Sequence, residues 1–288
     1  MERSLRSGPV PRSGRGDVVT AAVEHAADRC ADFGLVELDL LATLAGVPVP
    51  FPLRVPVAGR TDGERTALLG AARDALCVRG LADEHGPTGL AAELGAALRD
   101  YRGAVDVVVI GADTVTGAVA LVHRDRALVC RQRLCGADAG TVRVKQVTAA
   151  TLTDVLAGLV PDVPPASTMP ITLPPGVAGD AVRVLGDEPD PAAARYRVRE
   201  LVRARGGADG VVDQLTDLLP TLTGRGQLGV VRRSDATIAR PVELSWLDSP
   251  QGRVRVDHDD TGWVSVNPLR RGEIVRALRE VAAIARAR

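Results

Sequence analysis

The chain has 288 residues, enough for one large domain or two ordinary ones, and 45% of them are hydrophobic, so a sizeable core is possible. Basic and acidic residues balance at 36 each, which gives no overall field that would attract nucleic acid or an anionic membrane. No stretch approaches the roughly 18 apolar residues that a membrane span requires.

The N-terminal region contains two predicted segments. Residues 1–16 are basic and rich in Ser, Gly and Pro, which predicts a disordered tail. No apolar segment follows this run, so no secretory signal is expected and the cytosol is the default compartment. From Asp17 the pattern becomes helical, because Val18, Ala22, Ala26 and Cys30 fall on one face of a helix that Gly34 would end.

Residues 17–160 form the first predicted half. Further helices are expected at about 37–44, 61–79 and 90–101, and Thr61 with Glu64 forms a capping box at the start of the second. The period then changes from 3.6 to 2. Four strands are expected at about 105–111, 115–123, 126–132 and 141–147, with connections short enough for hairpins. A helix at about 150–159 closes this half.

Residues 161–189 are rich in proline and glycine around one predicted strand at 169–173, which indicates a connection between halves. The second half, residues 190–288, has predicted helices at about 191–205 and 210–219. Strands follow at about 226–233, 238–247, 252–258 and 262–266, and a last helix at about 270–287. The same order of helices, four-strand meander and helix therefore occurs twice. This order predicts an α+β fold with antiparallel sheets and helical bundles, in two quasi-symmetric halves that form one composite domain.

No pattern of residues predicts catalysis, a cofactor or a metal ion. The four histidines and four cysteines lack metal-ligand spacing, and the cysteines are expected to be small reduced core residues. Residues 224–229 match G-x-G-x-x-G, but they follow a predicted helix and precede a strand, the reverse of a dinucleotide-binding loop. The acidic run at 257–260 is best interpreted as a solvated hairpin turn.

The order of several short elements resembles the actinobacterial EspG family of ESX, or type VII, secretion proteins. These elements are Gly-Gln-Leu-Gly at 226–229, Asp-Ser-Pro-Gln-Gly-Arg at 248–253 and Gly-Trp-Val at 262–264. Glu-Leu-Asp at 37–39 and the proline-punctuated run 51–56 are similar to the family as well, so the resemblance covers roughly residues 35–287.

The resemblance implies a cytosolic chaperone, not an enzyme, with a central antiparallel sheet. Such a chaperone would bind helical export substrates of the PE/PPE or WXG100 type and keep them soluble. Strand alternation places charged side chains on sheet faces opposite their apolar neighbours, and these are candidate contacts for the partner. The candidates are Arg131, Arg143, Lys145, Glu243, Arg253 and Arg255, with Trp263 as an aromatic anchor.

Two alternatives remain open at this point. The chain is alternatively a self-associating scaffold or adaptor of the same secretion system, acting as a homodimer. An enzyme is the third hypothesis, and it would need a polar pocket with a perturbed carboxylate or histidine. Nucleic acid and membrane are not expected partners.

Overall fold

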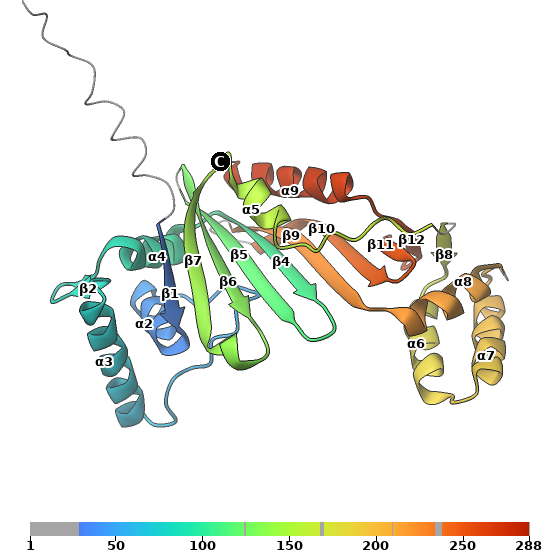
Figure 1. The fold of residues 1–288 in the computed structure, drawn as a ribbon, viewed down its shortest axis with the longest axis horizontal. Coiled ribbons are helices and arrows are strands. Elements are labelled where there is room, and N and C mark those ends of the chain that lie inside the picture. Colours follow the sequence, from blue (N-terminus) through green and yellow to red (C-terminus); the bar gives the residue numbers. More distant parts are fainter. Residues whose placement is uncertain (1–28, 124, 168–169, 209, 234–237, 288) are drawn as a thin grey trace, which may run out of the picture.

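The structure, a computed structural model, is shown in Figure 1. It describes residues 29–123, 125–167, 170–208, 210–233 and 238–287, apart from the side chains of residues 137 and 138. The predicted tail at 1–16 lies outside these residues, as does nearly all of the predicted helix that begins at Asp17. The end of that helix prediction is wrong, because Cys30–Gly34 forms a strand, β1. Phe33 is fully buried there and alternates with exposed neighbours, which is a period of two.

The first half follows the predicted order closely. After β1 come α2 (Leu35–Ala45), α3 (Asp62–Val78), the short strands β2 (Ala82–Asp83) and β3 (Gly86–Pro87), and α4 (Gly89–Asp100). The meander consists of β4 (Gly103–Ile110), β5 (Val115–His123), β6 (Arg126–Arg133) and β7 (Thr141–Thr148), and α5 (Leu152–Ala157) closes the half. One half of the predicted capping box is confirmed, because the Thr61 hydroxyl accepts a hydrogen bond from the Glu64 amide at 3.2 Å. The Glu64 carboxylate accepts from the Arg60 amide at 2.8 Å in place of the Thr61 amide.

The second half repeats this order. It runs through β8 (Ile171–Leu173), α6 (Val177–Asp187), α7 (Pro191–Ala204), α8 (Gly210–Leu218), β9 (Gly224–Arg233), β10 (Ile238–Ser249), β11 (Gly252–His258), β12 (Val264–Pro268) and α9 (Arg271–Arg286). Helix α6 lies in the segment interpreted from composition as a connection. The prolines and glycines of that segment obscured the helical pattern of α6, whose buried face contains Val177 and Ala181, both fully buried.

The two meanders join into one antiparallel sheet of ten strands among the described residues. The strand order is β1-β7-β6-β5-β4-β9-β10-β11-β12-β8, and the halves meet where β4 pairs with β9. Each strand in one half has a counterpart at the same distance from this junction in the other. The predicted α+β class and its quasi-symmetric halves are therefore confirmed.

One face of the sheet, called the closed face below, is covered across its middle by α5 and α9 (Figure 1). Alternate residues of the central strands, such as Val105, Val107 and Leu228, pack there against Leu278 and other residues of α9. All four of these side chains are at most 1% exposed. This packing makes the closed face the main hydrophobic core of the molecule.

The opposite face, called the open face, is covered only toward its two ends. Helices α2 and α4 pack on the strands of the first half, and α6, α7 and α8 pack on β8, β11 and β12 (Figure 1). The middle of the open face, on β4, β9 and β10, lies between these two helical groups. None of the described helices is long and apolar enough to cross a membrane.

Candidate functional site

A groove of about 590 Å³ occupies the middle of the open face. It is formed by β4, β9 and β10 together with the segment that links α2 to α3. Its lining is predominantly apolar, and it lies where neither helical group covers the sheet. An apolar concave surface with a few polar groups is the usual form of a binding site.

The floor of the groove continues the alternation of the strands. Val108 and Ile110 of β4 point to the open face, as do Leu247 of β10 and Val256 of β11. These four side chains are only partly buried, whereas the residues between them on the closed face form the core. The same strands therefore bury one apolar row and leave part of the other in contact with solvent.

One wall of the groove is the segment from Phe51 to Arg54. Pro52 lies over Gly117 of β5, where an added Cβ would come within 3.0 Å of the proline ring. Gln132 of β6 holds the backbone of Arg54 from both sides, accepting from its amide at 2.7 Å and donating to its carbonyl at 2.9 Å. The segment is thus fixed on the sheet while the Phe51 ring remains 60% exposed.

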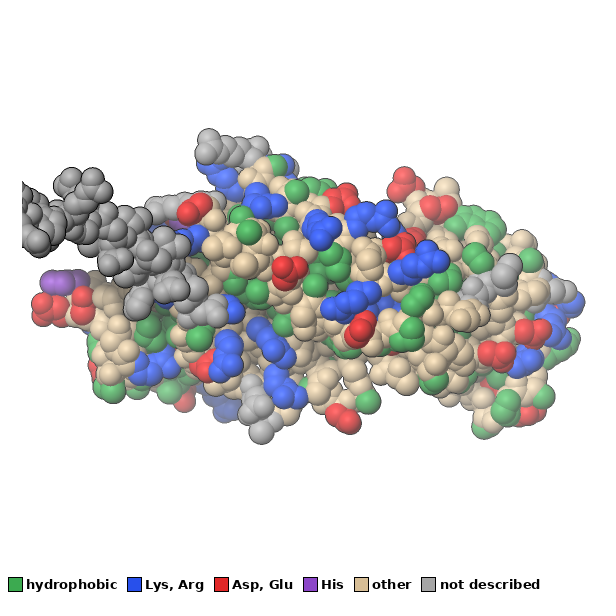
Figure 2. All heavy atoms as spheres, turned by 45° about the horizontal axis from the view of Figure 1, so that its top comes forward, with side chains coloured by type: hydrophobic (Ala, Val, Ile, Leu, Met, Phe, Trp, Pro, Cys, Tyr) green, Lys and Arg blue, Asp and Glu red, His purple; other side chains and the backbone are tan. Residues whose placement is uncertain are grey.

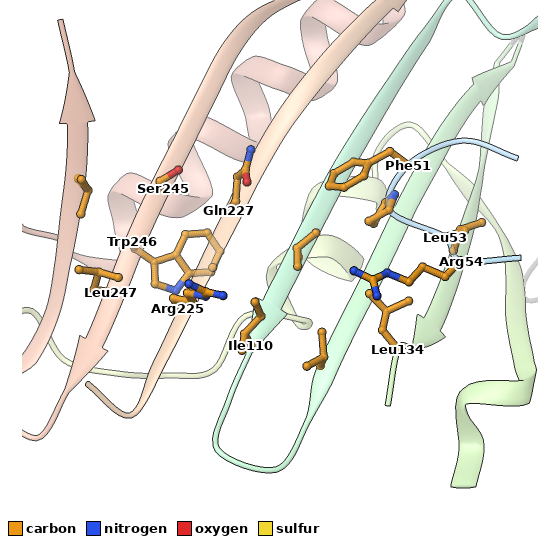
Figure 3. A pocket seen from close by; sticks show the side chains of 15 residues that line it. Phe51, Leu53, Arg54, Ile110, Leu134, Arg225, Gln227, Ser245, Trp246 and Leu247 are labelled. Carbon is orange, nitrogen blue, oxygen red and sulfur yellow. The ribbon is translucent and has the colours of Figure 1, made fainter. Parts of the chain in front are cut away.

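Two arginines flank the apolar floor. Arg54 extends from the fixed segment and Arg225 from β9, and Figure 3 shows both guanidinium groups turned toward the middle of the groove. Neither guanidinium forms a hydrogen bond or ion pair with another described residue. The described lining contains no Asp, Glu, His, Lys or Cys, so the groove has a positive local charge.

Further along the same strands the open face carries a charged cluster. Arg240 donates to both carboxylate oxygens of Asp106 on β4, at 2.8 and 2.9 Å, and to Glu243 at 2.6 Å. Its guanidinium crosses Gly229, where a side chain would collide with it. Burial raises the pKa of the Asp106 carboxyl, against the opposing effect of the hydrogen bonds from Arg240, and the nearby Glu243 charge raises it further.

The structure does not bring the seven predicted contact residues together. Arg131, Arg143 and Lys145 lie on the closed-face side of β6 and β7, beyond the helices that cover its middle. Figure 2, which views the molecule with the α9 side brought forward, shows basic side chains gathered over this part of the surface. Arg143 is bonded to Asp32 of β1 through two contacts of 2.8 and 2.9 Å.

The prediction for Arg253 is wrong, because its side chain is 1% exposed and cannot touch a partner. Its guanidinium is bonded to Asp248 at 2.6 and 2.9 Å and to the carbonyl of Pro161 at 3.1 Å, and it lies 5.3 Å from the Trp246 ring. Alternation correctly placed Arg253 opposite its apolar neighbours. It did not reveal that residues 161–166 cross over this part of the sheet, where Ala166 is buried.

The remaining candidates occupy three separate places. Glu243 is on the open face and belongs to the cluster around Arg240. Arg255 is on the opposite face and pairs with Asp257 at 2.6 Å. Trp263 is 37% exposed and follows the turn that begins at Asp259.

That turn was interpreted as a solvated hairpin, and the structure agrees. The Asp259 carboxylate accepts from the Thr261 hydroxyl at 2.7 Å, and from the backbone amides of Thr261 and Trp263 at 2.9 Å each. These hydrogen bonds, the Thr261 hydroxyl first, lower the pKa of Asp259. Asp259 therefore shapes the turn.

The glycines at 224–229 also have a packing role. They lie within β9, where the Trp246 ring rests on Gly226 and leaves no room for a side chain. Of the four cysteines only Cys130 is buried, and burial raises the pKa of its thiol to about 12. The expectation of four core cysteines was wrong, since Cys30, Cys77 and Cys135 are exposed. Among the described residues no group of three or more His, Cys, Asp or Glu could hold a metal ion.

Sequence reasoning missed Arg54 and Arg225 as site residues. Arg54 lies in the run 51–56 that resembles the family, and Arg225 comes directly before the similar element at 226–229. The proline-punctuated run was the available signal, because each proline fixes φ and so restricts the backbone of the segment. Alternation alone could not show which part of a sheet face stays uncovered.

The fold and the groove define a class: an α+β protein made of two similar halves around one antiparallel sheet, with an apolar groove on its open face. The model of the EspG family matches residues 35–280, and the chain belongs to that family. Among solved structures it is similar to the Mycobacterium tuberculosis type VII secretion system chaperone EspG5 in complex with the PE25–PPE41 dimer. That similarity has a TM-score of 0.61 at 11% identity, and covers 88% of this chain and 95% of the other. No curated protein matches this sequence.

Proposed function

We propose that this protein is a cytosolic chaperone of type VII secretion that binds helical substrates of the PE/PPE or WXG100 type through the groove on its open face. The observation that carries the proposal is an apolar groove left open in the middle of the sheet of an EspG family member. The similar solved structure is that of a chaperone, EspG5, in complex with a PE25–PPE41 dimer, which supports a substrate of that kind.

The mechanism of such a chaperone is shielding. A helical hairpin with an apolar tip is prone to associate with itself while the tip is in water. Burial of the tip against Val108, Ile110 and Leu247 would remove apolar area from water, at roughly 25 cal/mol per Å² before the costs of association. Because Gln132 already fixes the wall at Arg54, little ordering of that wall would oppose binding.

Binding without catalysis is the second part of the proposal. The described groove lining has one hydroxyl, that of Ser245, and no carboxylate, histidine, cysteine or lysine. The Ser245 hydroxyl donates to Glu243 at 3.5 Å, a long and weak hydrogen bond that would do little to activate it as a nucleophile. The buried Asp106 is bonded to Arg240 and is not part of that lining. These features support a protein that holds a substrate and does not transform it.

Co-expression tests the proposal directly. The chain is produced together with small helical proteins encoded beside it, and complexes are isolated by size exclusion. We expect co-elution with wild type, and loss of the complex when Ile110→Glu places a charge on the groove floor. Arg279→Gln, an exposed change on α9 on the other face, is the control.

Two results would contradict the proposal. One is that no helical neighbour co-elutes with the wild-type chain. The other is that Ile110→Glu and Arg279→Gln behave alike although both are folded by circular dichroism. Mass measurement over a concentration series separates the self-associating scaffold from the chaperone, because a scaffold would dimerise through the same groove without any substrate.

A further inference from the structure

The groove contains a charge pattern that an apolar substrate alone would not require. Arg54 and Arg225 face its middle from opposite sides, and no described acidic residue is among the residues that line it. Many other arginines of this chain are paired with carboxylates, for example Arg65 with Asp39, Arg143 with Asp32 and Arg240 with Asp106. Two arginines without such partners, next to an apolar floor, are therefore available to a ligand.

We infer that Arg54 and Arg225 select substrates whose apolar helical tip carries an Asp or Glu side chain beside the apolar residues. This inference rests on the proposed function and names the chemistry that the groove recognises. A guanidinium binds a carboxylate through two parallel hydrogen bonds, so it provides direction as well as charge. The apolar floor lowers the local dielectric constant and strengthens such a pair relative to one on an open surface.

The charges further along the sheet give the substrate an orientation. Asp106 pairs in register with Gly229, four residues along β9 from Arg225, which corresponds to about 13 Å. Among the described residues, the cluster there has two carboxylates, Asp106 and Glu243, and one cation, Arg240. One end of the open-face strip is thus positive and the other carries an excess of one negative charge. An acidic residue on the tip would be attracted to the Arg54 and Arg225 end and repelled from the other.

A library selection tests this inference separately from the proposed function. The probe is a helical hairpin displayed on phage, with the residues of its tip randomised. It is selected against the purified wild-type chain, the double variant Arg54→Gln/Arg225→Gln, and the control Arg279→Gln, an exposed change on α9. The arginines in the double variant are exposed, and thermal melting checks that each protein remains folded.

We expect wild type and Arg279→Gln to enrich tips that combine apolar residues with Asp or Glu. The double variant is expected to enrich apolar tips without the acidic preference. For one selected tip and its Glu→Gln counterpart, wild type is expected to bind the acidic form about tenfold more tightly, and the double variant equally. The tenfold preference is expected to weaken as salt is added, because ions screen the pair.

The outcomes separate the two ideas. If the wild-type chain enriches apolar tips with no acidic preference, this inference is wrong and the proposed function stands. If it enriches no apolar tips, the proposed function fails as well. If the double variant keeps the acidic preference, then another part of the chain provides it, and Arg54 and Arg225 are not the residues that select.

Discussion

Two aspartate–arginine pairs, one in each half of the sheet, are alike in geometry and opposite in surroundings. Asp32 and Arg143 join β1 to β7 near one edge, with side chains 49% and 67% exposed. Asp248 and Arg253 join β10 to β11, with side chains 10% and 1% exposed. Both pairs are bidentate. Arg143 lies between the buried Val142 and Val144, and Arg253 is followed by the buried Val254. Strand pattern and pair geometry therefore do not determine how much such a pair contributes to stability. That contribution depends on how much of the polypeptide covers the pair.

A third pair lies between these extremes. Asp106 is almost fully buried, whereas the side chain of Arg240 is 28% exposed. The three pairs form a series in which the same chemical groups pass from the interior to solvent. If desolvation controls their contribution, the cost of removing the carboxylate should fall along the series.

The largest effect is expected for Asp248→Ala. The change leaves the Arg253 guanidinium buried with only the Pro161 carbonyl and the Trp246 ring beside it. We expect a loss of about 3–5 kcal/mol in the free energy of unfolding, measured by chemical denaturation. The matched control, Asp248→Leu with Arg253→Met, removes both charges and should recover most of that loss. If Asp248→Ala lowers the free energy of unfolding by less than the corresponding change at the exposed Asp32 does, the comparison is wrong.

An intermediate effect is expected for Asp106→Asn, with a loss of about 1–2 kcal/mol at about pH 3, because one oxygen still accepts from Arg240. Its pH dependence is the sharper test. Burial raises the pKa of Asp106, so its contribution to stability is full below the unfolded pKa and is lost as pH rises through the folded value. Unfolding measured from about pH 3 to pH 7 should show the difference between wild type and variant shrinking as pH rises. A difference that grows would mean that Arg240 outweighs burial.

A smaller loss of stability, with the opposite dependence on pH, is expected for Asp32→Asn. The hydrogen bond from Arg143 lowers the pKa of Asp32, so its contribution is present above the unfolded pKa and is lost as pH falls through the folded value. Because the pair is largely exposed, the loss at neutral pH should be below about 1 kcal/mol. The same denaturation series measures it. A cost as large as that of Asp248→Ala would show that exposure does not set the contribution.

These pairs also show how far the sequence could predict this molecule. Hydrophobic period and turn residues located the four-strand meanders, the capped helix at Thr61 and the repeated order of the halves, because those signals are local. Helix α6 was not predicted, because the glycines and prolines around it indicated a connection. Strand β1 was not predicted, because its residues continue an apparent helical period. The burial of Arg253 and the opening at Arg225 depend on segments distant in sequence, at 161–166 and 51–54, whose positions no local pattern specifies.

The smallest expected effect is a gain in stability near the exposed pair of Asp32 and Arg143. Arg131 of β6 lies directly opposite Arg143 of β7 in the sheet register, on the same face, and like charges in such positions destabilise a sheet. Arg131→Glu would place a carboxylate beside Arg143 and is expected to raise the free energy of unfolding by a few tenths of a kcal/mol at low salt. Added salt should remove most of the gain, because both side chains are exposed. The double variant Arg131→Glu/Asp32→Asn sharpens the result, since the new carboxylate should then replace the lost one as the partner of Arg143. If Arg131→Glu instead destabilises the protein in both backgrounds, Arg131 makes a favourable contact of its own, and this end of the sheet is not the solvated surface that the comparison requires.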